Sequence, residues 1–161
     1  MKYTFLLLLI CGLFACSTKP TGTHVIYLDK LDHQATVEVN GNYGPGFYRY
    51  ALIENPPNSA DSIRQIIQQY CDSAVNKQDV EAHYVRYFIQ FYRLSDNTKS
   101  YQKGREDYWD VHNDINQELA DYRGEYRYER CIGDSLHGIW TMEINTPAGS
   151  KMDTLENKCA Q

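Results

Sequence analysis

The sequence lacks most of the patterns by which enzymes and metal proteins are recognised. Its five histidines are scattered without an HExxH spacing, and no CxxC pair, GxSxG turn or P-loop is present. The 16 basic residues are outnumbered by 21 acidic ones, and a net charge of -5 argues against nucleic acid as a partner. We therefore expect a non-enzymatic protein without a cofactor or metal, although a site built from residues far apart in the chain would leave no such motif.

Long apolar runs are also missing beyond the N-terminus, so we expect no membrane-spanning helix there. The first residues of the chain do contain a short apolar run. Lys2 is followed by an apolar stretch over residues 5–10 and then by Leu13-Phe14-Ala15-Cys16. A charged start, a short apolar segment and small residues before a cleavage site are typical of a secretory signal. The last four residues resemble the lipobox of bacterial lipoproteins, which directs acylation of the cysteine and cleavage ahead of it.

This resemblance implies that residues 1–15 are a signal peptide and that Cys16 carries a diacylglycerol, usually with a third acyl chain on its amino group. Two or three chains attach a protein stably, at about 0.8 kcal/mol per buried methylene group. The residue after the cysteine is Ser17 rather than the acidic residue that retains some lipoproteins in the inner membrane. We expect attachment to the outer membrane, facing the periplasm. Residues 16–23 are small and polar, which predicts a flexible tether.

The remaining residues, 24–161, predict a single α+β domain. Alternating or β-prone segments indicate strands at 35–39, 47–54, 83–94, 122–131 and 139–144, with 24–28 as an optional extra strand. Helical spacing of apolar residues indicates a helix capped by Asn58 or Ser59 and a second helix over 105–121. The last sixteen residues predict a polar tail. We expect a mostly antiparallel sheet of four to five strands with the two helices packed on one face. The long connections around the helices leave a mixed sheet open.

Three cysteines remain after the lipid-bearing one, in a compartment that oxidises thiols. Cys71 falls on the apolar face of the first helix and is expected to pack as a small hydrophobic residue. Cys131 ends a strand and Cys159 lies in the predicted tail. We favour a disulfide between Cys131 and Cys159, although cysteine spacing alone does not determine the pairing.

Tyrosine is the unusual component of the composition, with 14 Tyr against 5 Phe. An apolar ring that carries a hydroxyl suits partly wet interfaces. The candidate binding residues are therefore aromatic: Tyr84, Tyr92, Tyr126, Tyr128 and Trp109. Alternation places Tyr122, Tyr126 and Tyr128 on one side of their strand. We expect Tyr126 in the core and both Tyr84 and Tyr92 on an open face, where they would form a binding platform. The alternative at each position is a tyrosine at the border of the core, with its ring packed inside and its hydroxyl in water.

Two functions fit these patterns. An acidic, tyrosine-rich lipoprotein without catalytic motifs is most simply a module that binds another envelope protein, as an accessory subunit or as an inhibitor or immunity-like protein. The alternative is a binder of small molecules or glycans, with hydrolytic activity as a further option. A large concave pocket with convergent polar groups would favour that alternative.

Overall fold

The computed structural model describes residues 22–103 and 115–159. Seven strands form one sheet: β1 (His24–Tyr27), β2 (His33–Val39), β3 (Asn42–Glu54), β4 (Arg86–Arg93), β5 (Tyr122–Arg130), β6 (Gly138–Thr146) and β7 (Gly149–Asn157). Helices α1 (Ala60–Ala74) and α2 (Lys77–His83) connect β3 to β4. Two short 3-10 helices, η1 (Asp29–Leu31) and η2 (Lys99–Lys103), complete these elements. The expected signal peptide, Cys16 and Trp109 lie outside the described residues.

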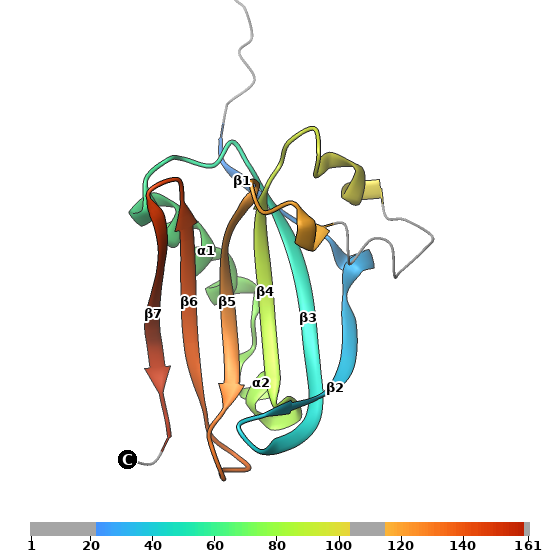
Figure 1. The fold of residues 1–161 in the computed structure, drawn as a ribbon, viewed down its shortest axis with the longest axis vertical. Helices are drawn as coiled ribbons and strands as arrows, with labels where there is room; N and C mark the ends of the chain where they lie inside the picture. The colour runs from blue at the N-terminus through green and yellow to red at the C-terminus, as the bar shows by residue number, and fades with distance from the viewer. Residues whose placement is uncertain (1–21, 104–114, 160–161) are drawn as a thin grey trace, which may run out of the picture.

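The sheet order is β1-β3-β4-β5-β6-β7, and β2 also pairs with β3 (Figure 1). β1 pairs with the end of β3 and β2 with its beginning, so both lie along the same edge of that long strand. β3 and β4 are parallel, whereas the other paired strands are antiparallel. The parallel pair follows from the crossover through α1 and α2, because parallel neighbours cannot be joined by a hairpin.

The expected α+β fold, with four to five strands and two helices packed on one face, is wrong. The described residues form mostly sheet, with seven strands. The predicted polar tail supplies β7, which completes the hydrogen bonding of β6 despite its exposed, polar side chains. The predicted helix over 105–121 lies mostly outside the described residues. The second α-helix that the structure describes is α2, only 7 residues long. No helix among the described residues is long and apolar enough to span a membrane.

Helix α1 has the local features that its sequence predicts. The Ser59 hydroxyl caps its first turn by accepting a hydrogen bond from the backbone N–H of Ser62. Asp61 lies in that turn, where the helix dipole favours a carboxylate. Ile63, Ile67 and Cys71 form one buried stripe along the helix. This stripe packs on the sheet, and α1 contacts β5 and β6 there.

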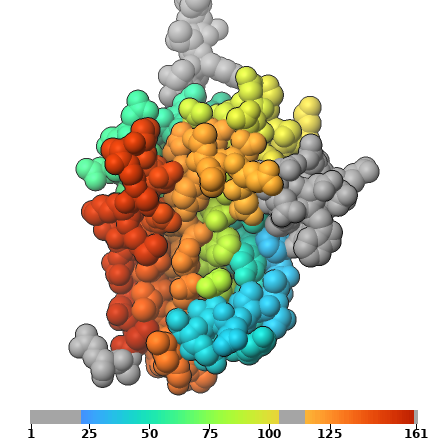
Figure 2. Space-filling model, in the orientation of Figure 1, coloured from blue at the N-terminus to red at the C-terminus, as the bar shows by residue number. Residues whose placement is uncertain are grey.

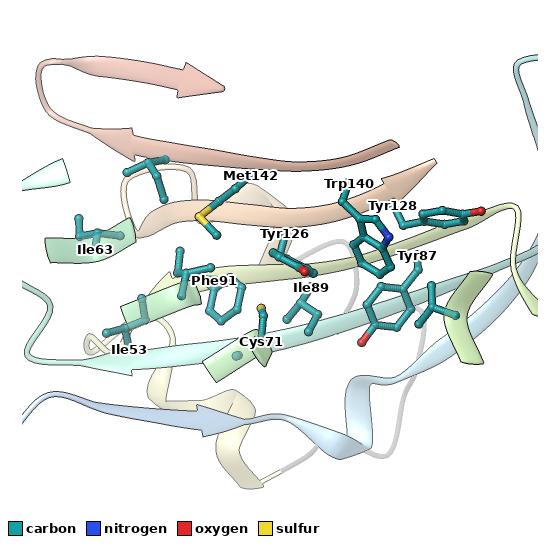
Figure 3. Close-up of a cluster of buried hydrophobic side chains, with 14 residues drawn as sticks. Ile53, Ile63, Cys71, Tyr87, Ile89, Phe91, Tyr126, Tyr128, Trp140 and Met142 are labelled. Carbon is teal, nitrogen blue, oxygen red and sulfur yellow. The ribbon is translucent and has the colours of Figure 1, made fainter. Parts of the chain in front are cut away.

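The main core lies between the helices and the sheet, and its centre is aromatic (Figure 3). The indole ring of Trp140 is fully buried, with the rings of Tyr126 and Tyr128 at centroid distances of 5.2 and 5.0 Å. The ring of Tyr87 also lies beside the indole, with a centroid distance of 6.3 Å. The expectation that Tyr126 belongs to the core is confirmed, because it is only 1% exposed.

A second, smaller core covers the opposite face of the sheet. Its buried members are Leu28, Leu31, Tyr50, Leu52, Tyr92, Tyr101 and Ile115, so η1 and η2 each contribute a residue. The expectation that Tyr92 is exposed is therefore wrong. Tyr92 does lie on the face of β4 opposite Ile89, but that face is covered here.

Strand β5 changes faces at a bulge. The pairing of β4 with β5 shifts at Tyr92, which lies opposite Tyr122, so that Arg123 is an extra residue beside Gly124. Gly124 has a φ of 153°, and a Cβ there would clash with the carbonyl oxygen of Glu143. The bulge turns Tyr122 to the smaller core, while Tyr126 remains in the main core. Simple alternation along this strand therefore placed Tyr122 on the wrong side.

Candidate functional site

The predicted tyrosine platform does not exist as a surface. Tyr126 and Tyr128 are 1% and 0% exposed, and Tyr92 is 2% exposed, so all three are structural residues. Tyr84 is the exception among the described candidates. It is half-buried, its hydroxyl accepts a hydrogen bond from the Gln34 amide at 3.3 Å, and its ring lines a small pocket.

Exposed apolar side chains instead gather at one end of the sheet. Tyr43 is 75% exposed, Ile132 82% and Leu136 70%. They lie in or beside two neighbouring turns, the β2–β3 turn (residues 39–43) and the β5–β6 loop (residues 131–137), which together we call the tip. Figure 2 shows these turns side by side, in cyan and orange, at the bottom of the molecule. Large apolar residues exposed together are typical of interaction sites.

The tip lies at the end of the sheet opposite the first described strand. His24 of β1 pairs with Glu54 at the end of β3, whereas the tip adjoins Asn42 at its start (Figure 1). A strand rises about 3.3 Å per residue, so these two ends of β3 are roughly 40 Å apart.

Two asparagine side chains join the turns of the tip. The Asn40 amide donates to the carbonyl oxygen of Arg130 at 2.9 Å, and the Asn42 amide donates to that of Cys131 at 2.7 Å. Asn40 and Gly41 have φ values of 52° and 77°, as a tight two-residue hairpin turn requires. The predicted strands at 35–39 and 47–54 left residues 40–46 as a longer loop, whereas β3 already begins at Asn42. The short turn holds both amides against the neighbouring loop.

The β5–β6 loop is also braced from within. The Arg130 guanidinium donates to the carbonyl oxygens of Glu81 and Tyr84, both at 2.7 Å, and to that of Ser135. Asp134 accepts hydrogen bonds from the backbone N–H groups of Leu136 at 2.7 Å and His137 at 3.0 Å. These bonds lower the pKa of Asp134 to about 2, so its carboxylate is ionised at neutral pH. Contacts within the protein thus hold this loop in one conformation.

A disulfide fastens the C-terminal segment to the tip. Cys131 is bonded to Cys159 across 28 residues, with their Cα atoms 5.6 Å apart. This is the pairing that the sequence favoured. Lys158 adds an ion pair with Glu81 of α2 at 2.9 Å. An open hollow of about 700 Å³ lies here, lined by the disulfide together with Asn40, Ile132, Asp134 and Ile139.

The described residues offer little for covalent or metal chemistry. They contain no group of three or more His, Cys, Asp or Glu side chains placed to hold a metal ion. Cys71 is a buried free cysteine, and burial raises the pKa of its thiol far above the usual range. A thiol held protonated in this way is a poor nucleophile.

Comparison with known proteins identifies no relative. No family model, no curated protein and no solved structure matches this chain. The tip was not predicted from the sequence, because the binding residues were chosen by aromatic content and most of those tyrosines lie on strands. Two signals were available in the sequence, the Asn40-Gly41 turn pair and the isolated Ile132 between Cys131 and Gly133.

Proposed function

We propose that this protein is a lipid-anchored envelope module that binds a partner protein through its tip. The observation that carries the proposal is the exposure of Tyr43, Ile132 and Leu136 on turns that hydrogen bonds and a disulfide hold in place. A rigid loop loses little conformational entropy on binding, so more of the contact energy appears as affinity. Exposed side chains of this kind act as anchors when a partner supplies a complementary apolar pocket.

The position of the tip suits a tethered protein. A tether over residues 16–23 would span at most about 28 Å when extended. With the roughly 40 Å between the two ends of β3, the tip would reach up to about 70 Å from the lipid surface. We infer that the partner is another protein of the envelope with an apolar surface pocket. Binding without chemistry, as an accessory subunit or an inhibitor, needs no more than this surface.

Anchoring by lipid depends on Cys16, and Cys16→Ser tests it. We expect the variant to incorporate no labelled fatty acid, to keep its signal segment and to be missing from the outer-membrane fraction. Cys11→Ser, which changes a cysteine within the proposed signal, is the matched control and should stay acylated and membrane-bound. Wild-type protein recovered soluble and without label would refute lipid anchoring.

The tip is tested by Ile132→Asp. A photo-crosslinker in place of Ser135, an exposed residue of the same loop, should trap one envelope protein, and excess unlabelled wild-type domain should compete it away. Ile132→Asp should lower this capture at least tenfold while the melting temperature changes little, since the side chain is 82% exposed.

Leu119→Asp is the matched control, because Leu119 is 71% exposed but lies outside the tip. Capture should be unaffected by this change. Equal loss in the two variants would indicate non-specific hydrophobic contact, and full capture by Ile132→Asp would show that the tip is not the binding surface.

A further inference from the structure

A second, smaller pocket lies on the helix-covered side of the sheet. It has a volume of about 190 Å³ and is lined by Phe47, Tyr84 and Tyr87, with Val80 of α2 and Arg49 of β3. The rings of Phe47 and Tyr84 stack with their centroids 5.4 Å apart and their planes inclined by 15°. The pocket therefore combines aromatic and aliphatic walls with one permanent cation.

Arg49 is held in place by two tyrosines. Its Nε donates to the Tyr27 hydroxyl at 2.9 Å and its Nη1 donates to the Tyr87 hydroxyl at 3.0 Å. Its guanidinium also lies over the Tyr27 ring, 4.3 Å from the centroid. Burial raises the pKa of Tyr87 to about 12, so this hydroxyl is neutral at physiological pH. These contacts orient the guanidinium plane.

Most N–H donors of this cation make no hydrogen bond to the part of the chain that the structure describes. A guanidinium has five N–H groups, and hydrogen bonds to described residues use one on Nε and one on Nη1. The Arg49 side chain is nevertheless only 16% exposed. No nitrogen of Arg49 is among the buried side-chain atoms that lack a hydrogen-bond partner, so its remaining N–H groups are accessible to a ligand. Two parallel N–H groups of a guanidinium match the two oxygens of a carboxylate. Unused donors on an oriented, mostly buried arginine that lines a pocket point to an anionic ligand.

The surrounding charges limit that anion to a single negative charge. The Asp32 carboxylate lies 3.4 Å from Nε of Arg49 and partly balances its charge. Asp79 adds a second carboxylate to the lining of the pocket. A dianion such as a phosphate monoester would be repelled by both. A monoanion would gain the hydrogen bonds of Arg49 at less electrostatic cost.

We propose that this pocket binds a small monocarboxylate. Its two oxygens accept hydrogen bonds from Arg49, and its ring or short chain lies against Phe47, Tyr84 and Val80. The site is separate from the tip and does not depend on the function proposed for it. The ligand class follows from the unused donors, the single cation and the apolar walls.

Sodium benzoate is a suitable probe, with benzamide as its neutral isostere. Calorimetric titration of the purified protein should give saturable binding of benzoate at one site, at least tenfold tighter than binding of benzamide. Backbone amide signals of residues around the pocket, such as Val80, should shift in NMR spectra, while those of Ile132 at the tip should not. Equal affinity for the two probes, or no saturable binding of benzoate, would overturn the proposal.

Three variants locate the site. Arg49→Lys removes the pair of parallel N–H donors and should weaken benzoate binding at least tenfold. Arg64→Lys is the matched control, because Arg64 lies on α1 outside the pocket lining, and it should leave benzoate binding unchanged. Tyr84→Ala removes a half-buried wall and should weaken binding at least threefold, which keeps the test decisive if Arg49→Lys does not fold. Unchanged affinity in Tyr84→Ala, or in folded Arg49→Lys, would place the benzoate elsewhere.

Discussion

Trp140→Ala is expected to lower the free energy of unfolding by about 4 kcal/mol, the range for a buried Trp replaced by Ala. The side chain is 0% exposed and lies among the rings of Tyr87, Tyr126 and Tyr128. Its removal leaves a cavity that these large rings cannot fill without moving. It also removes the hydrogen bond that the indole Nε1 donates to Glu81 at 2.9 Å. Chemical denaturation followed by circular dichroism measures the change.

Two controls accompany this prediction. Trp140→Phe keeps a ring in the core and loses the indole N–H, so we expect a smaller loss, about 1 to 2 kcal/mol. Met152→Ala should have almost no effect, because this side chain on β7 is 56% exposed. Similar stability in Trp140→Ala and Met152→Ala would mean that the aromatic core is not packed as described.

Cys131→Ser is expected to lower the free energy of unfolding by about 3 to 4 kcal/mol. In the chain-entropy model this is the stabilisation from a disulfide that closes a loop of 28 residues. Cys159→Ser should have nearly the same effect, and the double variant should lose little more, since either change removes the same bond. Melting curves with and without reductant measure the loss, which wild-type protein should show only under reduction.

Peptide mapping without reduction provides the independent check. It should link the fragment with Cys131 to the fragment with Cys159, and Cys71 should react with alkylating agents only after denaturation, because it is 1% exposed. A cross-link from Cys71 to either of the other two would contradict the structure.

Release of residues 157–159 would also loosen the tip, so Cys159→Ser should reduce partner capture while leaving benzoate binding intact.

Helix α1 was predictable because all of its determinants are local. The Ser59 cap, Asp61 in the first turn and the stripe through Ile63 and Ile67 lie within a few turns of one another. The disulfide was predictable for a related reason, because few cysteines remained to be paired. In both cases the residues that decide the outcome can be read from the sequence: the cap and apolar stripe for the helix, and the three remaining cysteines for the disulfide.

The surfaces were much less predictable. The alternation along β4 is also that of a strand with one exposed face, and Tyr92 is buried because residues of η1, η2 and neighbouring segments pack on that face. Strand β7 has the polar composition of a tail and is ordered by its pairing with β6. The Arg49 pocket brings together β3, β4 and the stretch from the end of α1 into α2, which are distant in sequence.

The sequence by itself determined the lipobox resemblance, the first helix, most of the strands and the preferred cysteine pair, because periodicity, caps and motifs act over short distances. Only the tertiary structure decided which face of each strand is covered, that Gly124 switches Tyr122 between the two cores, and that the tip and the Arg49 pocket exist at all. These properties depend on contacts between segments dozens of residues apart. A residue's own neighbours in the chain cannot specify what will lie against it after folding.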